Sequence, residues 1–148
     1  MAGVLNSNAD SHPSLSSASL RQMIQDAVAA ELASDDRVLA VYLLGSAAAG
    51  RLRADSDIDI AVMAPPGTHL SEVERADIAT GLSYRLGRQV DVGLLSSRNL
   101  VYANEALHTG IRLYARDADA AALYAANLLG LYLEFNERRQ EIINAYTV

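Results

Sequence analysis

Two aspartates, Asp57 and Asp59, lie two residues apart in the segment Asp-Ile-Asp-Ile-Ala-Val. Alternate side chains of a strand point to the same face, so both carboxylates share one face while Ile58 points to the other. At surface-like dielectric constants, two such charges repel by roughly 1 to 4 kcal/mol. Because Mg²⁺ prefers one or two protein carboxylates together with phosphate oxygens and water, we expect this pair to bind magnesium.

A glycine and a serine, Gly45 and Ser46, come before this pair, and ten residues separate Ser46 from Asp57. Glycine permits a sharp turn and the close approach of a ligand. A short helix beginning at Ser46 would offer free N–H groups, with the serine hydroxyl, to a phosphate. A phosphate-binding turn followed by paired carboxylates is what a metal-dependent phosphoryl or nucleotidyl transfer requires.

A third carboxylate, Asp91, lies between Val90 and Val92 in the segment VDVGLL. A charged residue between two β-branched residues is unusual in a strand that the sequence predicts to be internal. If this strand lies beside the strand of Asp59, the Asp91 carboxylate joins the other two. It would then complete a second metal site or accept the proton of an attacking hydroxyl.

Each of these features also has an ordinary structural explanation. Asp55 and Asp57 are common turn residues, and a glycine-serine pair is frequent in proteins. Loop arginines are often only solvated; we expect Arg53 to contact phosphate and leave the role of Arg51 open. The combination of all these features, in the right strand context, favours a nucleotide and metal site.

The elements that must position these residues follow from hydrophobic periodicity and capping signals. A capping box at Ser19 and Gln22 predicts a helix to about Ala33, and another at Ser71 and Glu74 predicts a helix that ends before Gly87. Strands are expected at 38–44, 58–63 and 90–95, followed by a helix over 99–108 and a short edge strand at 112–115.

Three segments divide the chain. Residues 1–18 are rich in Ser, Asn and Ala and are expected to form a flexible tail, whereas 19–116 form the folded domain. Residues 117–148 form a helical extension: one long helix, or two joined near Asn127 and Gly130. At 1.5 Å per residue, thirty helical residues extend roughly 45 Å. Since a core of about 100 residues has a radius of gyration near 13 Å, this helix should overhang the domain or fold back.

The apolar residues of the C-terminal segment exceed what one core-facing stripe needs. They cover more than one side of a helix: Leu128, Leu129, Leu131, Tyr132, Leu133 and Phe135. Gly130 costs a helix about 1 kcal/mol relative to alanine, which the close approach of another backbone would offset. We expect this extension to bind a partner; the alternative is that it packs on its own sheet.

Composition limits the class of protein. The 148 residues suffice for one domain with a hydrophobic core, and no apolar run reaches the 20 or so residues that span a bilayer. The absence of cysteine excludes disulfides and thiolate metal sites. With a net charge of −6, the chain should not bind nucleic acid directly. No signal peptide is recognisable, and we expect a soluble cytoplasmic protein with no membrane contact.

The segment GSAAAGRLRADSDIDI resembles the signature of the DNA polymerase β-like nucleotidyltransferase superfamily, and the resemblance extends over about residues 20–116. It implies an α/β (α+β) fold, with a small mixed sheet, flanking helices and here a long C-terminal helical segment. By resemblance, Asp57 and Asp59 bind two Mg²⁺ ions, and Asp91 is the third carboxylate, which activates the acceptor hydroxyl. The nucleotide-binding residues would be Gly45, Ser46, Arg53 and Ser56.

The short chain resembles the minimal nucleotidyltransferases of the MntA type, and the tail LYLEFNERRQEIINAYTV is also similar to theirs. Those antitoxins transfer AMP from ATP to a tyrosine of a HEPN ribonuclease toxin, which implies a hetero-oligomer with the toxin. The toxin's own pattern, an arginine followed after four to six residues by histidine, does not occur here. Two alternatives remain: an antitoxin that acts by binding alone, or a small-molecule nucleotidyltransferase of the antibiotic-modifying kind.

Overall fold

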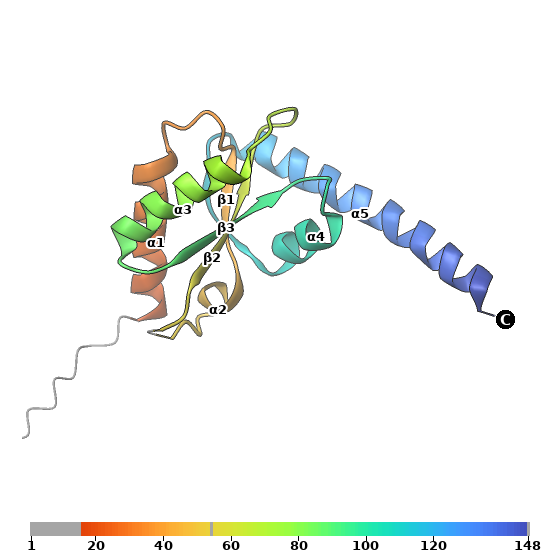
Figure 1. Cartoon of the computed structure of the whole chain (residues 1–148), viewed down its shortest axis with the longest axis horizontal. Helices are drawn as coiled ribbons and strands as arrows, with labels where there is room; N and C mark the ends of the chain where they lie inside the picture. Colours follow the sequence, from red (N-terminus) through yellow and green to blue (C-terminus); the bar gives the residue numbers. More distant parts are fainter. Residues whose placement is uncertain (1–15, 54, 148) are drawn as a thin grey trace, which may run out of the picture.

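Four strands form one mixed sheet in the order β3-β2-β1-β4 (Figure 1). The computed structural model describes residues 16–53 and 55–147. The central strand β1 (Ala40–Leu43) runs antiparallel to β2 (Ile58–Met63) and to β4 (Ile111–Ala115). Strand β3 (Val90–Leu95) lies parallel to β2. It is an edge strand, so the prediction that this segment is an internal strand is wrong. The helices are α1 (Ser17–Leu32), α2 (Gly45–Ala48), α3 (Glu72–Leu86), α4 (Leu100–Thr109) and α5 (Ala118–Tyr146).

The two faces of the sheet carry separate hydrophobic clusters because side chains alternate along each strand. Ile58, Ile60 and Val62 of β2 pack against α1 and α3. Ala61 and Met63 face the other way and pack with residues of α4 and α5. Asp59 belongs by alternation to this second face, but it is exposed whereas Ala61 and Met63 are fully buried. The sheet is therefore left open where Asp59 lies.

Helix α3 begins and ends where the sequence predicts. The Ser71 side chain accepts a hydrogen bond from the Glu74 backbone N–H at 3.1 Å. The helix ends at Gly87, whose φ of +63° is a conformation that favours glycine. The chain then enters β3, so β2, α3 and β3 form one crossover unit that places β3 beside β2.

The start of α1 differs from the prediction. The cap is Ser16, whose side chain accepts from the Ser19 N–H at 3.2 Å, so Ser17 and Ala18 belong to the helix and not to the tail. The Ser17 hydroxyl donates to the Gly50 carbonyl at 3.0 Å, which fixes the first helical turn against the loop after α2. The predicted start is wrong because several neighbouring serines can each cap a helix. The contact between Ser17 and Gly50, which distinguishes them, cannot be read from the local sequence. The rest of the predicted tail, residues 1–15, lies outside the described residues.

Helix α5 is one continuous helix of 29 residues, with no break at Asn127 or Gly130. Its first half packs on the domain through the buried residues Ala121 and Leu128. Its second half continues beyond the sheet, as the overhang prediction requires (Figure 1). Among the helices of the described residues, none has the length and apolar character that crossing a bilayer requires.

Candidate active site

The turn after β1 holds Gly45 close to Asp59. The Leu44 N–H donates to the Asp59 carbonyl at 2.9 Å, and the backbone then turns through Gly45 with φ at +61°. A Cβ atom at Gly45 would lie only 3.2 Å from the Asp59 Oδ2 atom. The turn therefore requires glycine for its conformation and for its proximity to a carboxylate. Ser46 follows it in α2 and is half-buried.

The parallel pairing of β2 and β3 places Asp59 directly opposite Asp91. Since paired residues of neighbouring strands project to the same face, the two carboxylates lie side by side. Asp57 directly precedes β2. Although the Asp59 residue is exposed overall, the protein atoms around its carboxyl partly desolvate it, which raises its pKa above the ordinary value, and the negative charges of Asp91 and Asp57 raise it further. The condition that the sequence analysis set for Asp91, a strand beside that of Asp59, is thus met.

Asp57, Asp59 and Asp91 offer only carboxylate oxygens as metal ligands. Such oxygens bind hard divalent cations such as Mg²⁺. The raised pKa of Asp59 reflects partial desolvation first and repulsion from Asp91 and Asp57 second, and a bound cation would favour the ionised carboxylate against both. Within residues 16–53 and 55–147, no three acidic or histidine side chains are already arranged as ligands of one ion. The donor chemistry fits a magnesium site that phosphate oxygens of a substrate would complete.

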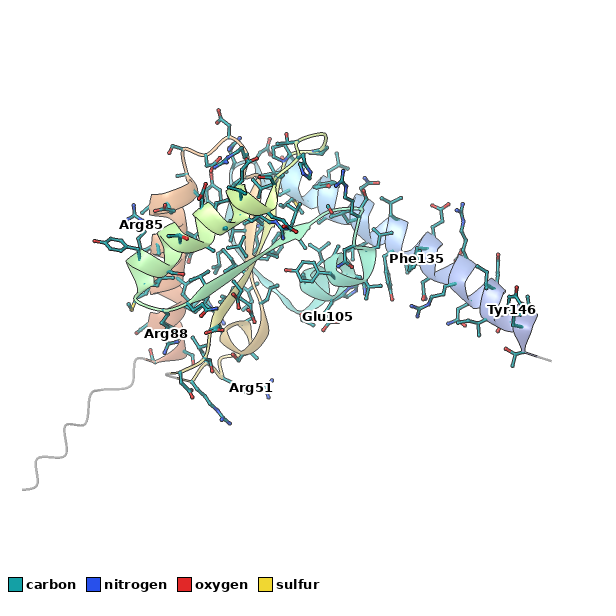
Figure 2. The ribbon with its side chains drawn as sticks, viewed as in Figure 1. Arg51, Arg85, Arg88, Glu105, Phe135 and Tyr146 are labelled. Carbon is teal, nitrogen blue, oxygen red and sulfur yellow. The ribbon has the colours of Figure 1, made fainter. Side chains whose placement is uncertain are left out.

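Residues 50–53 and 55–56 lie between α2 and the aspartates. The Ser56 N–H donates to the Arg53 carbonyl at 3.1 Å, which forms a turn just before Asp57. Ser56 is half-buried, whereas the Arg53 side chain is exposed. Arg51 projects outward at the end of the molecule that carries α2 (Figure 2). The structure thus places Gly45 against Asp59, pairs Asp59 with Asp91 and puts Asp57 directly before β2, and it leaves Arg53 and Ser56 in the loop.

Tyr102 of α4 is a site residue that the sequence patterns did not reveal. A Cβ atom at Gly93 of β3 would overlap the Tyr102 hydroxyl, so the tyrosine lies directly on the strand. Burial raises the pKa of Tyr102, and the negative charge of Asp59 raises it further. The one signal in the sequence is Gly93, because a glycine inside a strand often marks close approach by another group.

A cleft of about 530 Å³ opens beside β3, between α3 and the start of α4. Gly93 and Tyr102 line it on the side nearest the aspartates, and its charged residues include Arg75 and Arg98. The Nε atom of Arg75 is buried and has no hydrogen-bond partner. A smaller hollow, lined by Asp91 and Arg75 among others, borders this cleft along the edge of the sheet. We call the larger hollow the β3 cleft.

Residues 27–119 match the family model described as polymerase β, nucleotidyltransferase. The match covers most of the chain and spans β1, β2 and β3 with the turn and all three aspartates. The chain therefore belongs to the polymerase β-like nucleotidyltransferase family, and the expected α/β fold with a small mixed sheet is confirmed.

Particular relatives within this family are antitoxins. Protein adenylyltransferase MntA of Shewanella oneidensis (strain MR-1) is 32% identical over 104 residues, which cover 70% of this chain and 73% of that protein. A crystal structure of a toxin–antitoxin with AMP-PNP contains a chain with 26% identity and a TM-score of 0.66, covering 86% of this chain and 98% of that one. A structure of the tri-AMPylated Shewanella oneidensis HEPN toxin in complex with its MNT antitoxin gives 25% identity, a TM-score of 0.65 and coverage of 86% and 99%.

Proposed function

We propose that this chain is an antitoxin that transfers AMP from ATP to a tyrosine hydroxyl of a HEPN-type ribonuclease toxin and thereby neutralises it. The observation that carries the proposal is the pairing of Asp59 with Asp91 beside the glycine turn at Gly45. Support also comes from the relatives, one named as a protein adenylyltransferase and one solved with an AMPylated toxin. We place the reaction in the cytoplasm, where ATP is available.

The turn at Gly45 and Ser46 would bind the triphosphate through backbone N–H groups and the serine hydroxyl, with Arg53 and Ser56 at its margin. The tyrosine oxygen attacks the α-phosphorus, and the bond from this phosphorus to the oxygen bridging to the β-phosphate breaks. Pyrophosphate leaves, and a phosphodiester joins AMP to tyrosine. The tyrosine proton passes to the carboxylate of Asp91.

Magnesium would be held by Asp57, Asp59 and Asp91, two ions being the expected number. When bound, it supplies positive charge that stabilises the attacking and leaving oxygens. The protein's own contribution is to hold three carboxylates at one open end of the sheet, within reach of the phosphate-binding turn. The raised pKa of Asp59 means that this carboxylate accepts protons more readily than usual, so acid should inhibit metal binding.

Mass spectrometry of the toxin tests the proposal. The HEPN toxin that pairs with this chain would be co-expressed with the wild type and with the Asp57→Ala/Asp59→Ala variant, and the toxin then weighed. We expect mass increments of whole AMP units with the wild type and none with the variant. Neutralisation without any mass change would instead support an antitoxin that acts by binding alone. If the toxin is unaffected by either form, a small-molecule acceptor becomes the better hypothesis.

We also propose that the second half of α5 binds the toxin. Large apolar side chains are exposed there, among them Leu133 at 63% and Ile142 at 60%. No heavy atom lies within 4 Å of a Cβ added at Gly130, so another backbone can approach it closely. Figure 2 shows Phe135 and Tyr146 on the part of α5 that extends beyond the domain. Two solved chains that align with this one along nearly their whole length come from toxin–antitoxin structures, which favours the toxin over a second copy as the occupant.

A further inference from the structure

We propose that the β3 cleft is the acceptor subsite and that Arg75 and Arg98 within it recognise an anion attached close to the reactive hydroxyl of the acceptor. This inference rests on the proposed nucleotidyl transfer, and it adds the chemistry by which the acceptor is selected. Two sources of this anion share the same chemistry: acidic side chains flanking the acceptor tyrosine, or the phosphodiester of an AMP already attached to it, in which case a ribose hydroxyl of that AMP is the nucleophile.

The arrangement of the strands fixes the side from which the acceptor approaches. In an in-line displacement the attacking and leaving oxygens lie on opposite sides of the phosphorus. The phosphate-binding turn follows β1, which pairs with β2 on one side, and Gly45 lies against the Asp59 carboxylate. Asp91 is on the other side, in β3 at the edge of the sheet. An acceptor that meets Asp91 therefore arrives from the β3 edge.

The β3 cleft lies at this edge and is large enough to admit a side chain or a nucleotide. Gly93 contributes to its wall two residues after Asp91, so it lies on the same face of β3. The Tyr102 hydroxyl stands over Gly93 and is close enough to the aspartates for the charge of Asp59 to act on it. The cleft therefore begins next to the carboxylates, since Gly93 in its wall and Asp91 are only two residues apart on the same strand.

The charge of the β3 cleft is opposite to that of the chain. The protein carries a net charge of −6, yet Arg75, Arg98 and His69 line the cleft with Glu72 as its one acidic residue. The Arg75–Glu72 contact is long, at 4.0 Å, and the buried Nε of Arg75 has no partner. A guanidinium with donors to spare is suited to carboxylate or phosphate oxygens. Arg98 is exposed at the opposite end of the lining, after β3.

Binding of short tyrosine peptides tests the subsite without any chemical turnover. Three blocked peptides would be titrated into the full ¹⁵N-labelled chain without ATP or magnesium: one with alanines flanking the tyrosine, one with glutamates, and one with O-AMP-tyrosine. We expect an anionic peptide to shift the amide signals of Gly93, Leu94 and Asn99 and to bind at least ten times more tightly than the neutral peptide. Whichever anionic peptide does so identifies the source of the anion.

Variants make the test specific. Arg75→Ala/Arg98→Ala should weaken this binding roughly tenfold or more, as expected for the loss of charge-assisted hydrogen bonds, and the double lysine variant should restore part of it. The matched control is Arg85→Ala, on the same helix but at its other end (Figure 2). Equal binding of neutral and anionic peptides, shifts confined to Gly45 and Ser46, or no shift at millimolar peptide would each overturn the proposal. Because the toxin mass assay is separate, failure of the subsite and failure of nucleotidyl transfer are distinguishable.

Discussion

Asp59 is less stable as an ion in the folded chain than in water, because burial and two neighbouring carboxylates raise its pKa above the ordinary 3.8. Between 3.8 and this raised value, the native state binds more protons than the unfolded state. The free energy of unfolding therefore falls as pH rises through this window, and the loss persists at neutral pH. A site that concentrates negative charge lowers stability in order to bind a cation.

Replacing Asp59 with asparagine removes its negative charge, and with it both the cost of desolvating that charge and its repulsion from Asp57 and Asp91. We expect Asp59→Asn to raise the free energy of unfolding at pH 7 by up to about 1 kcal/mol, a small gain because the site is open to solvent. The gain should shrink below pH 3.8, where the wild-type carboxyl is protonated in both states. Urea denaturation at several pH values measures it. A variant less stable than the wild type at pH 7 would show that the charge of Asp59 is already balanced.

Magnesium should act on stability in the opposite direction. An ion that binds only the native carboxylates raises the midpoint of thermal unfolding with concentration. We expect Mg²⁺ to raise this midpoint for the wild type, and to do so much less for Asp59→Asn. Calcium at equal ionic strength separates site binding from screening, because the two ions screen alike but differ in the number and geometry of the oxygen ligands that they require. Equal effects of Mg²⁺ on both proteins would argue against a site at Asp59.

The residue patterns predicted the three aspartates and the glycine turn, but not Tyr102. Asp57, Asp59 and Asp91 each stand out because a charge inside an apolar strand needs an explanation. Tyr102 lies on an ordinary amphipathic helix, and its importance arises only when α4 packs against β3. The functional roles of the three aspartates, like those of Ser46, Arg53 and Ser56, stay predictions.

At the scale of elements, the positions of the strands in the sequence were predictable, but the order in which they pair in the sheet was not. The bounds 58–63 and 90–95 coincide with β2 and β3 because apolar runs end at clear turn signals. That β3 pairs with β2 depends on how α3 crosses over, which no spacing within the chain states. Of the two alternatives that the sequence left open for the C-terminal segment, the single long helix is confirmed: one glycine costs a helix only about 1 kcal/mol, which 29 residues tolerate.

The contact between β3 and α4 can be tested at Gly93. A methyl group there would overlap the Tyr102 hydroxyl, so we expect Gly93→Ala to lower the free energy of unfolding by about 1 to 3 kcal/mol. Gly130→Ala is the matched control: it has open space around it and should leave stability equal or slightly higher. Urea denaturation measures both.

A double variant separates overlap from strand propensity. If the hydroxyl is the obstacle, Gly93→Ala should be less destabilising in a Tyr102→Phe background than in the wild type. Additive effects of the two substitutions would mean that the hydroxyl is not the obstacle and that the Tyr102 ring, whose Cζ atom would lie 2.6 Å from the added Cβ atom, accounts for the loss.

At the scale of the whole molecule, α5 divides into a half that stabilises the domain and a half that does not. Ile142 and Ile143 are exposed on the second half, at 60% and 47%. We expect Ile142→Ser/Ile143→Ser to change the free energy of unfolding by no more than about 0.5 kcal/mol, as for ordinary surface sites. Affinity for the toxin, measured by calorimetry, should fall at least tenfold if these side chains lie at the centre of the interface.

The control for this experiment is Glu141→Ser, which alters the adjacent exposed residue without removing apolar surface. Sedimentation of the isolated chain tests whether a second copy of the chain binds to this surface instead. Self-association that the double serine variant abolishes would show that it does. Unchanged toxin affinity in that variant would place the interface elsewhere on the molecule.

The exposure of Asp57, Asp59 and Asp91 determines how readily water could hydrolyse a bound triphosphate in place of the transfer reaction. No segment among the described residues covers them, so bulk water has the same access to a bound triphosphate as any hydroxyl. Enzymes that avoid hydrolysis usually close a lid over the substrate before chemistry. If the chain acts as proposed, the acceptor protein would take the place of such a lid: its docking would deliver the hydroxyl and exclude water, and so would link consumption of the nucleotide to the presence of a substrate.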